Sequence, residues 1–119
     1  MLRFGIIGTN WITDDFVDAA KRSEDITLTA VYSRKEETGR AFADKHGIAR
    51  AYDDLERFAA SDEFDAVYIA SPNSLHAEQA ILCMNRGKHA LCEKPLASNA
   101  REVRRMTEAA KANGVLLME

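Results

Sequence analysis

The chain has 119 residues, of which 46% are hydrophobic and 29% are charged, a composition typical of one globular domain with a real core. Lys and Arg total 16 against 19 Asp and Glu, and this net charge of −3 excludes a general attraction to nucleic acid or to an anionic membrane surface. No apolar stretch approaches the roughly 20 residues that cross a bilayer.

The remaining bulk features concern targeting and cysteine chemistry. The N-terminal segment MLRFGIIG is too short and too weakly charged for a secretory signal peptide. Cys83 and Cys92 form no C-x-x-C pair, and two cysteines are too few for a disulfide framework. We expect reduced, buried cysteines in a cytoplasmic protein, and we assign no metal site.

The first half of the chain alternates β-rich apolar runs with helical patterns. Residues 2–8 and 26–33 predict strands, and residues 11–23 and 35–46 predict helices, the second ending at Gly47. The residues expected on the inward face of the first helix are Ile12, Phe16, Ala19 and Ala20. Those expected to face inward from the second are Thr38, Ala41 and Phe42.

The second half repeats this alternation. Residues 50–52 predict a very short strand, and Asp53 or Asp54 is expected to cap a brief helix after it. Residues 65–71 form an apolar run without polar alternation, as expected for a strand covered by helices on both faces. Further helices are expected over 75–86 and 100–113, and further strands over 89–93 and 115–119.

Six strands separated by helices predict an α/β fold, a Rossmann-type doubly wound parallel sheet in three αβα layers. We expect the strand order 3-2-1-4-5-6, with the last strand at a sheet edge or paired with another chain. The chain stops inside a strand, and nothing in it resembles a substrate-binding half. We therefore interpret residues 1–119 as one domain of a longer protein, with apolar surface exposed near Lys94.

A turn at Gly8–Thr13 follows the first predicted strand. Turns that cradle a pyrophosphate often read G-x-G-x-x-G, and here the three glycine positions hold Gly8, Asn10 and Thr13. Asparagine tolerates left-handed backbone, and its amide can donate to a phosphate oxygen. Trp11 is either a lid beside the turn or a core residue. An ordinary strand–helix corner is the alternative interpretation.

Ser33, Arg34 and Lys35 follow the second predicted strand, at the position where many dinucleotide sites carry a carboxylate for the ribose hydroxyls. A hydroxyl and two cations suit a ribose 2′-phosphate better than a bare hydroxyl. The alternative is a polar helix start with two exposed cations.

Two further stretches follow the strands of the second half. In ASPNSLH (residues 70–76), Asn73 or Ser74 is a candidate helix cap, and a lone histidine such as His76 is usually structural or solvated. In CEKPLA (residues 92–97), Lys94 precedes a proline that stiffens the chain. We predict a cis peptide at Lys94–Pro95, which would direct the lysine back towards a bound nicotinamide.

With these four stretches at these spacings, the whole chain resembles the N-terminal domain of the Gfo/Idh/MocA family, the relatives of glucose–fructose oxidoreductase and inositol dehydrogenase. The resemblance implies an NAD(P)-binding Rossmann domain followed by a substrate domain, with a catalytic role for Lys94 beside the nicotinamide. The residues that it implies for cofactor binding are Gly8, Thr9, Asn10, Trp11, Ile12, Ser33, Arg34, Lys35, Ala70, Ser71, Pro72, Asn73, His76, Glu93, Lys94 and Pro95.

Our leading hypothesis is the cofactor domain of an oxidoreductase that transfers hydride between NADP or NAD, with NADP favoured, and a sugar, polyol or related carbonyl compound. The alternatives are a non-catalytic dinucleotide-sensing module and an α/β interaction domain that binds no nucleotide. Lys94 favours the enzyme, because a sensor needs no cation beside the ring. The sequence leaves open the substrate and the oligomeric state, including a homo-oligomer of the full-length protein.

Overall fold

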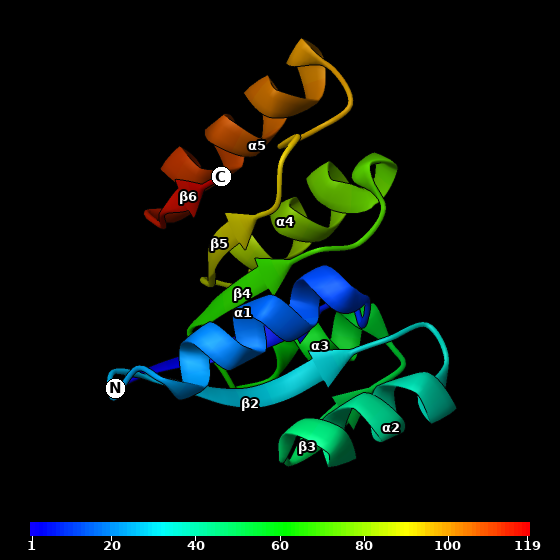
Figure 1. Cartoon of the computed structure of the whole chain (residues 1–119). Helices are drawn as coiled ribbons and strands as arrows, with labels where there is room; N and C mark the ends of the chain where they lie inside the picture. The colour runs from blue at the N-terminus through cyan, green and yellow to red at the C-terminus, as the bar shows by residue number, and fades with distance from the viewer.

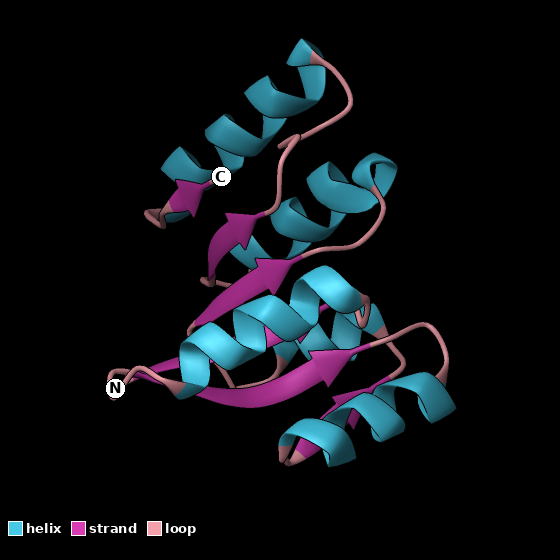
Figure 2. Ribbon diagram, viewed as in Figure 1, coloured by secondary structure: helices cyan, strands magenta, loops and turns pink.

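In the computed structural model, which describes residues 1–119, six parallel strands form one sheet with helices on both faces (Figure 1; Figure 2). The strand order is β3-β2-β1-β4-β5-β6, which confirms the order predicted from the sequence. The strands are β1 (Leu2–Ile7), β2 (Ile26–Tyr32), β3 (Arg50–Tyr52), β4 (Ala66–Ile69), β5 (His89–Cys92) and β6 (Leu117–Met118).

Five α-helices connect these strands, and their distribution over the two faces is unequal. The helices are α1 (Trp11–Lys21), α2 (Glu36–His46), α3 (Leu55–Ala60), α4 (His76–Met84) and α5 (Ala100–Asn113). Helices α1 and α2 pack over the β1–β3 half of one face, whereas α3, α4 and α5 cover the opposite face (Figure 1). This division follows from right-handed crossovers, because the chain reverses direction across the sheet after β3.

The core is divided by the sheet into clusters on its two faces. The larger cluster lies under α3, α4 and α5, where Phe58, Phe64 and Met106 are fully buried. On the other face, Val17 of α1 and Phe42 of α2 are buried against the first two strands. All four residues of β4 are buried, as its apolar run predicted.

On the face of the sheet that carries α1 and α2, no helix covers β5 and β6. Ala90 and Cys92 of β5 are buried towards α4 and α5, while Leu91 between them is only partly buried on the opposite face. Beyond it, Leu116 is 64% exposed and Met118 is 59% exposed at the sheet edge. The edge position of the last strand was expected from the sequence.

The inward faces that we predicted for α1 and α2 are confirmed at Ala20 and Phe42, which are buried, and wrong at Ala19, Thr38 and Ala41. In α1 the buried residues are Thr13, Val17 and Ala20, whereas Ala19 is exposed. In α2 the buried residues are Gly39, Phe42 and Ala43, and both Thr38 and Ala41 are exposed. Small side chains face the sheet because the helices approach it closely: a Cβ on Gly39 would lie 3.2 Å from Cβ of Ser33.

Several local predictions are confirmed. Gly47 ends α2 in a left-handed conformation, and Asp54 caps α3 by accepting from the backbone N–H of Arg57. The Lys94–Pro95 peptide is cis. None of the helices has the length and apolar character that a membrane crossing requires.

Candidate functional site

The carboxyl ends of β1, β2, β4 and β5 meet at one edge of the sheet, and Gly8, Ser33, Ser71 and Lys94 all lie there, as predicted. Two open grooves lie at this edge. The basic groove has a volume of about 940 Å³ and contains Arg34 and Lys35 but no carboxylate. The acidic groove has a volume of about 600 Å³ and contains three carboxylates and Lys94.

The turn after β1 brings the backbone of the first strand against that of the loop after β4. Gly8 has a φ of +113°, and a Cβ there would lie 2.9 Å from the carbonyl carbon and oxygen of Ala70. Residues other than glycine rarely adopt this φ. The atoms that a Cβ would meet belong to the backbone of Ala70, which cannot move aside as the end of a long side chain can. Glycine is therefore required at this position by both conformation and space.

Asn10 joins the same two segments through its side chain. Its Oδ1 accepts from the backbone N–H groups of Ile12 (3.0 Å) and Thr13 (3.2 Å), and its Nδ2 donates to the carbonyl oxygen of Ala70 at 2.8 Å. Asn10 is therefore the N-cap of α1, with an extended backbone at φ −84°. The backbone at Asn10 is extended rather than left-handed, and one of the two Nδ2 hydrogens is already bonded to Ala70.

The turn nevertheless presents backbone donors to the basic groove. The N–H groups of Thr9 and Asn10 form no hydrogen bond within the chain, and they lie beside the positive end of the α1 dipole. Such a cluster of unpaired N–H groups is suited to an anion. Trp11, at the start of the helix, is 72% exposed, which excludes a role in the core.

The end of β2 supplies the positive charge of the basic groove. The backbone N–H of Ser33 donates to the carbonyl oxygen of Tyr52, which fixes the strand end. Arg34 and Lys35 are exposed, and neither forms an ion pair with a carboxylate. Two cations that form no ion pair within the chain are suited to a phosphate group.

The loop after β4 forms the opposite wall of the basic groove. The hydroxyl of Ser71 donates to Oε1 of Gln79, a side chain only 6% exposed. Residues Asn73–Leu75 form a 3₁₀ turn before α4, and neither Asn73 nor Ser74 caps the helix with its side chain. The predicted cap is wrong because this turn, in which Leu75 N–H donates to the carbonyl oxygen of Pro72, already satisfies the local backbone.

His76, the first residue of α4, is 1% exposed and lies between the two loops. Its Nε2 is 2.8 Å from the carbonyl oxygen of Ser71, and its Nδ1 is 2.9 Å from the carbonyl oxygen of Pro95. Both ring nitrogens are therefore occupied by protein groups.

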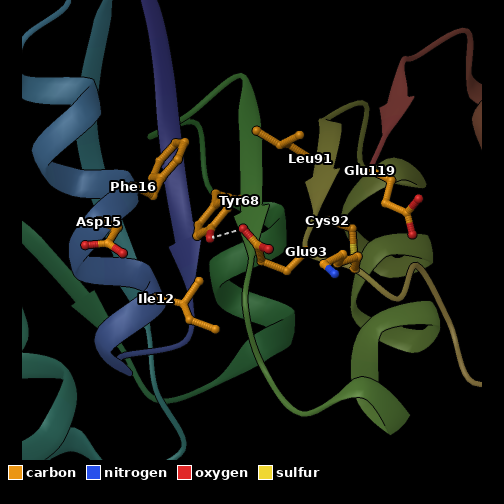
Figure 3. A pocket seen from close by; sticks show the side chains of 9 residues that line it. Ile12, Asp15, Phe16, Tyr68, Leu91, Cys92, Glu93 and Glu119 are labelled. Carbon is orange, nitrogen blue, oxygen red and sulfur yellow. Dashed lines mark hydrogen bonds between the residues drawn. The ribbon is translucent and has the colours of Figure 1, made fainter.

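The acidic groove lies on the half of the sheet that α1 borders but does not cover (Figure 3). The ring of Tyr68 stacks on Phe16 with centroids 4.0 Å apart, and its hydroxyl donates to Oε2 of Glu93 at 2.6 Å. Burial, together with this carboxylate, raises the pKa of Tyr68. The ammonium group of Lys94 forms no ion pair, so it is available to a ligand.

The structure thus divides the predicted residues between two places. Nine line the basic groove: Gly8, Thr9, Asn10, Ser33, Arg34, Lys35, Ala70, Ser71 and Pro72. Three line the acidic groove: Ile12, Glu93 and Lys94. Trp11, Asn73 and Pro95 lie at the same edge but line neither groove, and His76 lies between the loops.

Two polar side chains at these grooves, Gln79 and Tyr68, were not predicted from the sequence. Gln79 lies three residues after His76, so helical spacing could have placed it on the same face. Tyr68 carries the one hydroxyl of an otherwise apolar strand, a signal that was visible in the run AVYI. Nowhere do three His, Cys, Asp or Glu side chains group so that they could hold a metal ion.

Known proteins share both the sequence and the fold of this chain. Residues 2–119 match the Gfo/Idh/MocA oxidoreductase family in its NAD-binding Rossmann fold. The scyllo-inositol 2-dehydrogenase (NADP(+)) IolU of Bacillus subtilis is 65% identical over all 119 residues, and an uncharacterized oxidoreductase of Escherichia coli, YgjR, is 50% identical over the same length. The chain spans 36% of the length of each of these relatives.

Among solved structures, a 3-ketoreductase from Actinomadura kijaniata in complex with NADP and TDP-benzene superposes with a TM-score of 0.92 at 31% identity. That match covers 99% of this chain and 36% of the reductase. A NAD binding oxidoreductase from Klebsiella pneumoniae gives a TM-score of 0.92 at 32% identity, over 98% of this chain and 33% of that one. Sequence and fold agree, and the chain belongs to the Gfo/Idh/MocA oxidoreductase family, of which it represents the NAD-binding Rossmann fold.

Proposed function

We propose that this chain is the NADP(H)-binding domain of an oxidoreductase that acts on a sugar, polyol or related carbonyl compound. The observation that carries the proposal is the basic groove, which lies where the strand order reverses between β1 and β4 and combines free backbone donors with two unpaired cations. Ligands of open parallel sheets bind at this switch point.

The groove fits a dinucleotide in its charge and in its two walls. The Gly8 turn and the free N–H groups of Thr9 and Asn10 would hold the pyrophosphate, with Trp11 and Ile12 beside it. At the adenosine end, Ser33, Arg34 and Lys35 would receive the 2′-phosphate. This assignment favours NADP over NAD, because a carboxylate that would repel the phosphate is absent from the groove.

The nicotinamide end would lie at the β4 and β5 side of the edge, where the second half of the sheet ends. The residues that we assign to this end are Ala70, Ser71, Pro72, Asn73, Glu93, Lys94 and Pro95, with the buried His76 behind the two loops that carry them. A bound nicotinamide supplies the hydride chemistry. Lys94 would donate a hydrogen bond to the reacting oxygen of the substrate, while Tyr68 holds the adjacent Glu93 carboxylate in one position.

The relatives support the substrate class and a second domain. They include a 1,5-anhydro-D-fructose reductase from Ensifer adhaerens, 37% identical, of which the chain again spans only about a third (35%). We infer that a further domain completes the acidic groove and recognises the substrate.

The two buried cysteines form no disulfide, which supports a reducing compartment such as the cytoplasm.

Calorimetric titration of the chain with NADPH and NADH, in parallel and at low salt, tests this function. A charge-assisted hydrogen bond contributes about 1.5–3 kcal/mol, so we expect NADPH to bind about 10- to 150-fold more tightly than NADH. Arg104 on α5 is exposed and lies outside both grooves, so Arg104→Ala is the matched control for replacing Arg34 of the basic groove. Arg104→Ala should change neither the NADPH affinity nor the NADH affinity. Failure of the chain to bind either cofactor would contradict the proposal.

A further inference from the structure

His76 is the one side chain that hydrogen-bonds to both of the loops that separate the two grooves. Through Nε2 it contacts the carbonyl oxygen of Ser71, a residue of the basic groove, at 2.8 Å. Through Nδ1 it contacts the carbonyl oxygen of Pro95, which directly follows Lys94 of the acidic groove, at 2.9 Å. The two loops are joined there by no other side-chain hydrogen bond.

The burial of His76 excludes a simple surface role. The residue is 1% exposed, and it starts α4, whose next residue, Ala77, packs in the larger core cluster. Its position is therefore set by the rigid part of the domain, and both loops are held relative to that part. Neutral imidazole donates from one nitrogen and imidazolium from both, so in either form at least one loop is held.

We propose that His76 is a positioning residue that fixes the distance between the wall of the basic groove and Lys94, and so aligns the nicotinamide end of the cofactor. The inference rests on the proposed function, because it needs a dinucleotide that extends from one groove to the other. It assigns His76 no contact with cofactor or substrate, since both of its nitrogens bind backbone carbonyls.

This role has a signature that a general loss of structure would not produce. Adenosine 2′,5′-bisphosphate carries the 2′-phosphate end of NADPH and lacks the nicotinamide end. Replacing His76 should therefore weaken NADPH and leave adenosine 2′,5′-bisphosphate unchanged. We expect NADPH to bind about 10-fold more weakly to His76→Leu. This is the effect expected from losing one or two of the hydrogen bonds that hold the loops of Ser71 and Pro95 in place.

Two conservative variants test the individual contacts. The amide of asparagine can take the place of Nδ1, and the amide of glutamine can take the place of Nε2. His76→Asn should retain the contact to Pro95 and His76→Gln the contact to Ser71, so each should lose less NADPH affinity than His76→Leu. If a urea titration shows no cooperative unfolding transition for His76→Leu, that variant is not folded. The affinities for NADPH and adenosine 2′,5′-bisphosphate are then compared in the two polar variants instead.

The outcomes separate this inference from the function beneath it. Selective loss of NADPH, graded from Leu to the two amides, supports the role of His76. Equal loss of both ligands, or folded variants with undiminished NADPH affinity, would overturn that role while the proposed function stands. Binding of neither ligand by the unmodified chain would overturn both.

Discussion

The two grooves at the carboxyl edge of the sheet lie side by side but are built differently. The basic groove has walls on both sides, from the turns after β1 and β2 and from the loop after β4, and it contains cations without carboxylates. The acidic groove lies where the α1 face has no helix over β5 and β6, and it contains Asp15, Glu93 and Glu119 around Lys94. We infer that the first groove is complete within this chain, whereas the second needs a partner surface.

The largest effect is expected where the basic groove is most tightly built. Gly8→Ala places a Cβ 2.9 Å from the backbone of Ala70 at a φ of +113°. Strain and overpacking together should lower the free energy of unfolding by about 2 kcal/mol or more, measured by urea denaturation.

Gly47→Ala is the matched control for this prediction. Gly47 also has a positive φ, +70°, but a Cβ there would meet nothing within 4 Å. Its replacement should cost only the conformational contribution of about 1 kcal/mol. Equal losses in the two variants would show that close approach of the two backbones at Gly8 has no energetic importance.

A smaller effect is expected from the tyrosine of the acidic groove. Tyr68→Phe removes the hydroxyl that donates to Glu93 and keeps the ring that stacks on Phe16. We expect the free energy of unfolding to fall by about 1 kcal/mol, since Glu93 can recover part of the lost bond from water. Affinity for adenosine 2′,5′-bisphosphate, which would occupy the basic groove alone, should stay unchanged; a large loss of this affinity would contradict the separation of the two grooves.

The sequence predicted the order of the strands and the edge at which the site lies, because apolar runs of strand length alternate with helical patterns. It predicted the buried faces of α1 and α2 only in part, at Ala20 and Phe42. Ile12 and Phe16 are apolar, yet they border the open groove, where burial by this chain is incomplete. The inward positions that the sequence missed include Thr13 and Gly39, which an apolar pattern does not mark; at Gly39 the helix lies so close to the strand that a Cβ would be 3.2 Å from Cβ of Ser33.

For the candidate site too, the sequence predicted where the residues lie but not which long-range contacts they make. Spacing alone brought Gly8, Ser33, Ser71 and Lys94 to one edge, because the ends of parallel strands must meet there. The role of Asn10 depends on where the carbonyl group of Ala70 lies, 60 residues away in sequence, and no local pattern contains that information. The double contact of His76 has the same origin.

The thiol of the acidic groove should be chemically inert in the folded chain. Burial raises the pKa of Cys92, and likewise that of Cys83 in α4, to about 12. Iodoacetamide at pH 8 should therefore leave both residues unmodified, as measured by mass spectrometry, and should alkylate both once urea unfolds the chain. Rapid modification of Cys92 under native conditions would show that the groove opens to this depth.

The smallest effect is expected at the opposite edge of the sheet, away from both grooves. Hydrogen bonds from Arg3 hold the pKa of Asp65 below its ordinary value of 3.8. The stability from this pair is therefore fully present above about pH 4 and is lost as the pH falls through the lowered pKa.

Replacement of Asp65 tests this linkage. Asp65→Asn should have a slightly lower urea midpoint than the unmodified chain at pH 7, and the difference should shrink towards pH 2. Cofactor affinity should not change. A difference that grows on acidification would contradict the assigned direction.

In the proposed function, the basic groove holds the 2′-phosphate of NADP(H) through Arg34. This role is tested by a four-way comparison of dissociation constants, for NADPH and NADH with the unmodified chain and with Arg34→Ala, at low salt. We predict that Arg34→Ala weakens NADPH by about 10- to 150-fold and NADH little, so that the preference between the cofactors largely disappears. The preference of the unmodified chain should also narrow as salt rises, because exposed charges are screened. Equal loss of both cofactors, or tighter binding of NADH by the unmodified chain, would contradict the assignment of the 2′-phosphate to Arg34.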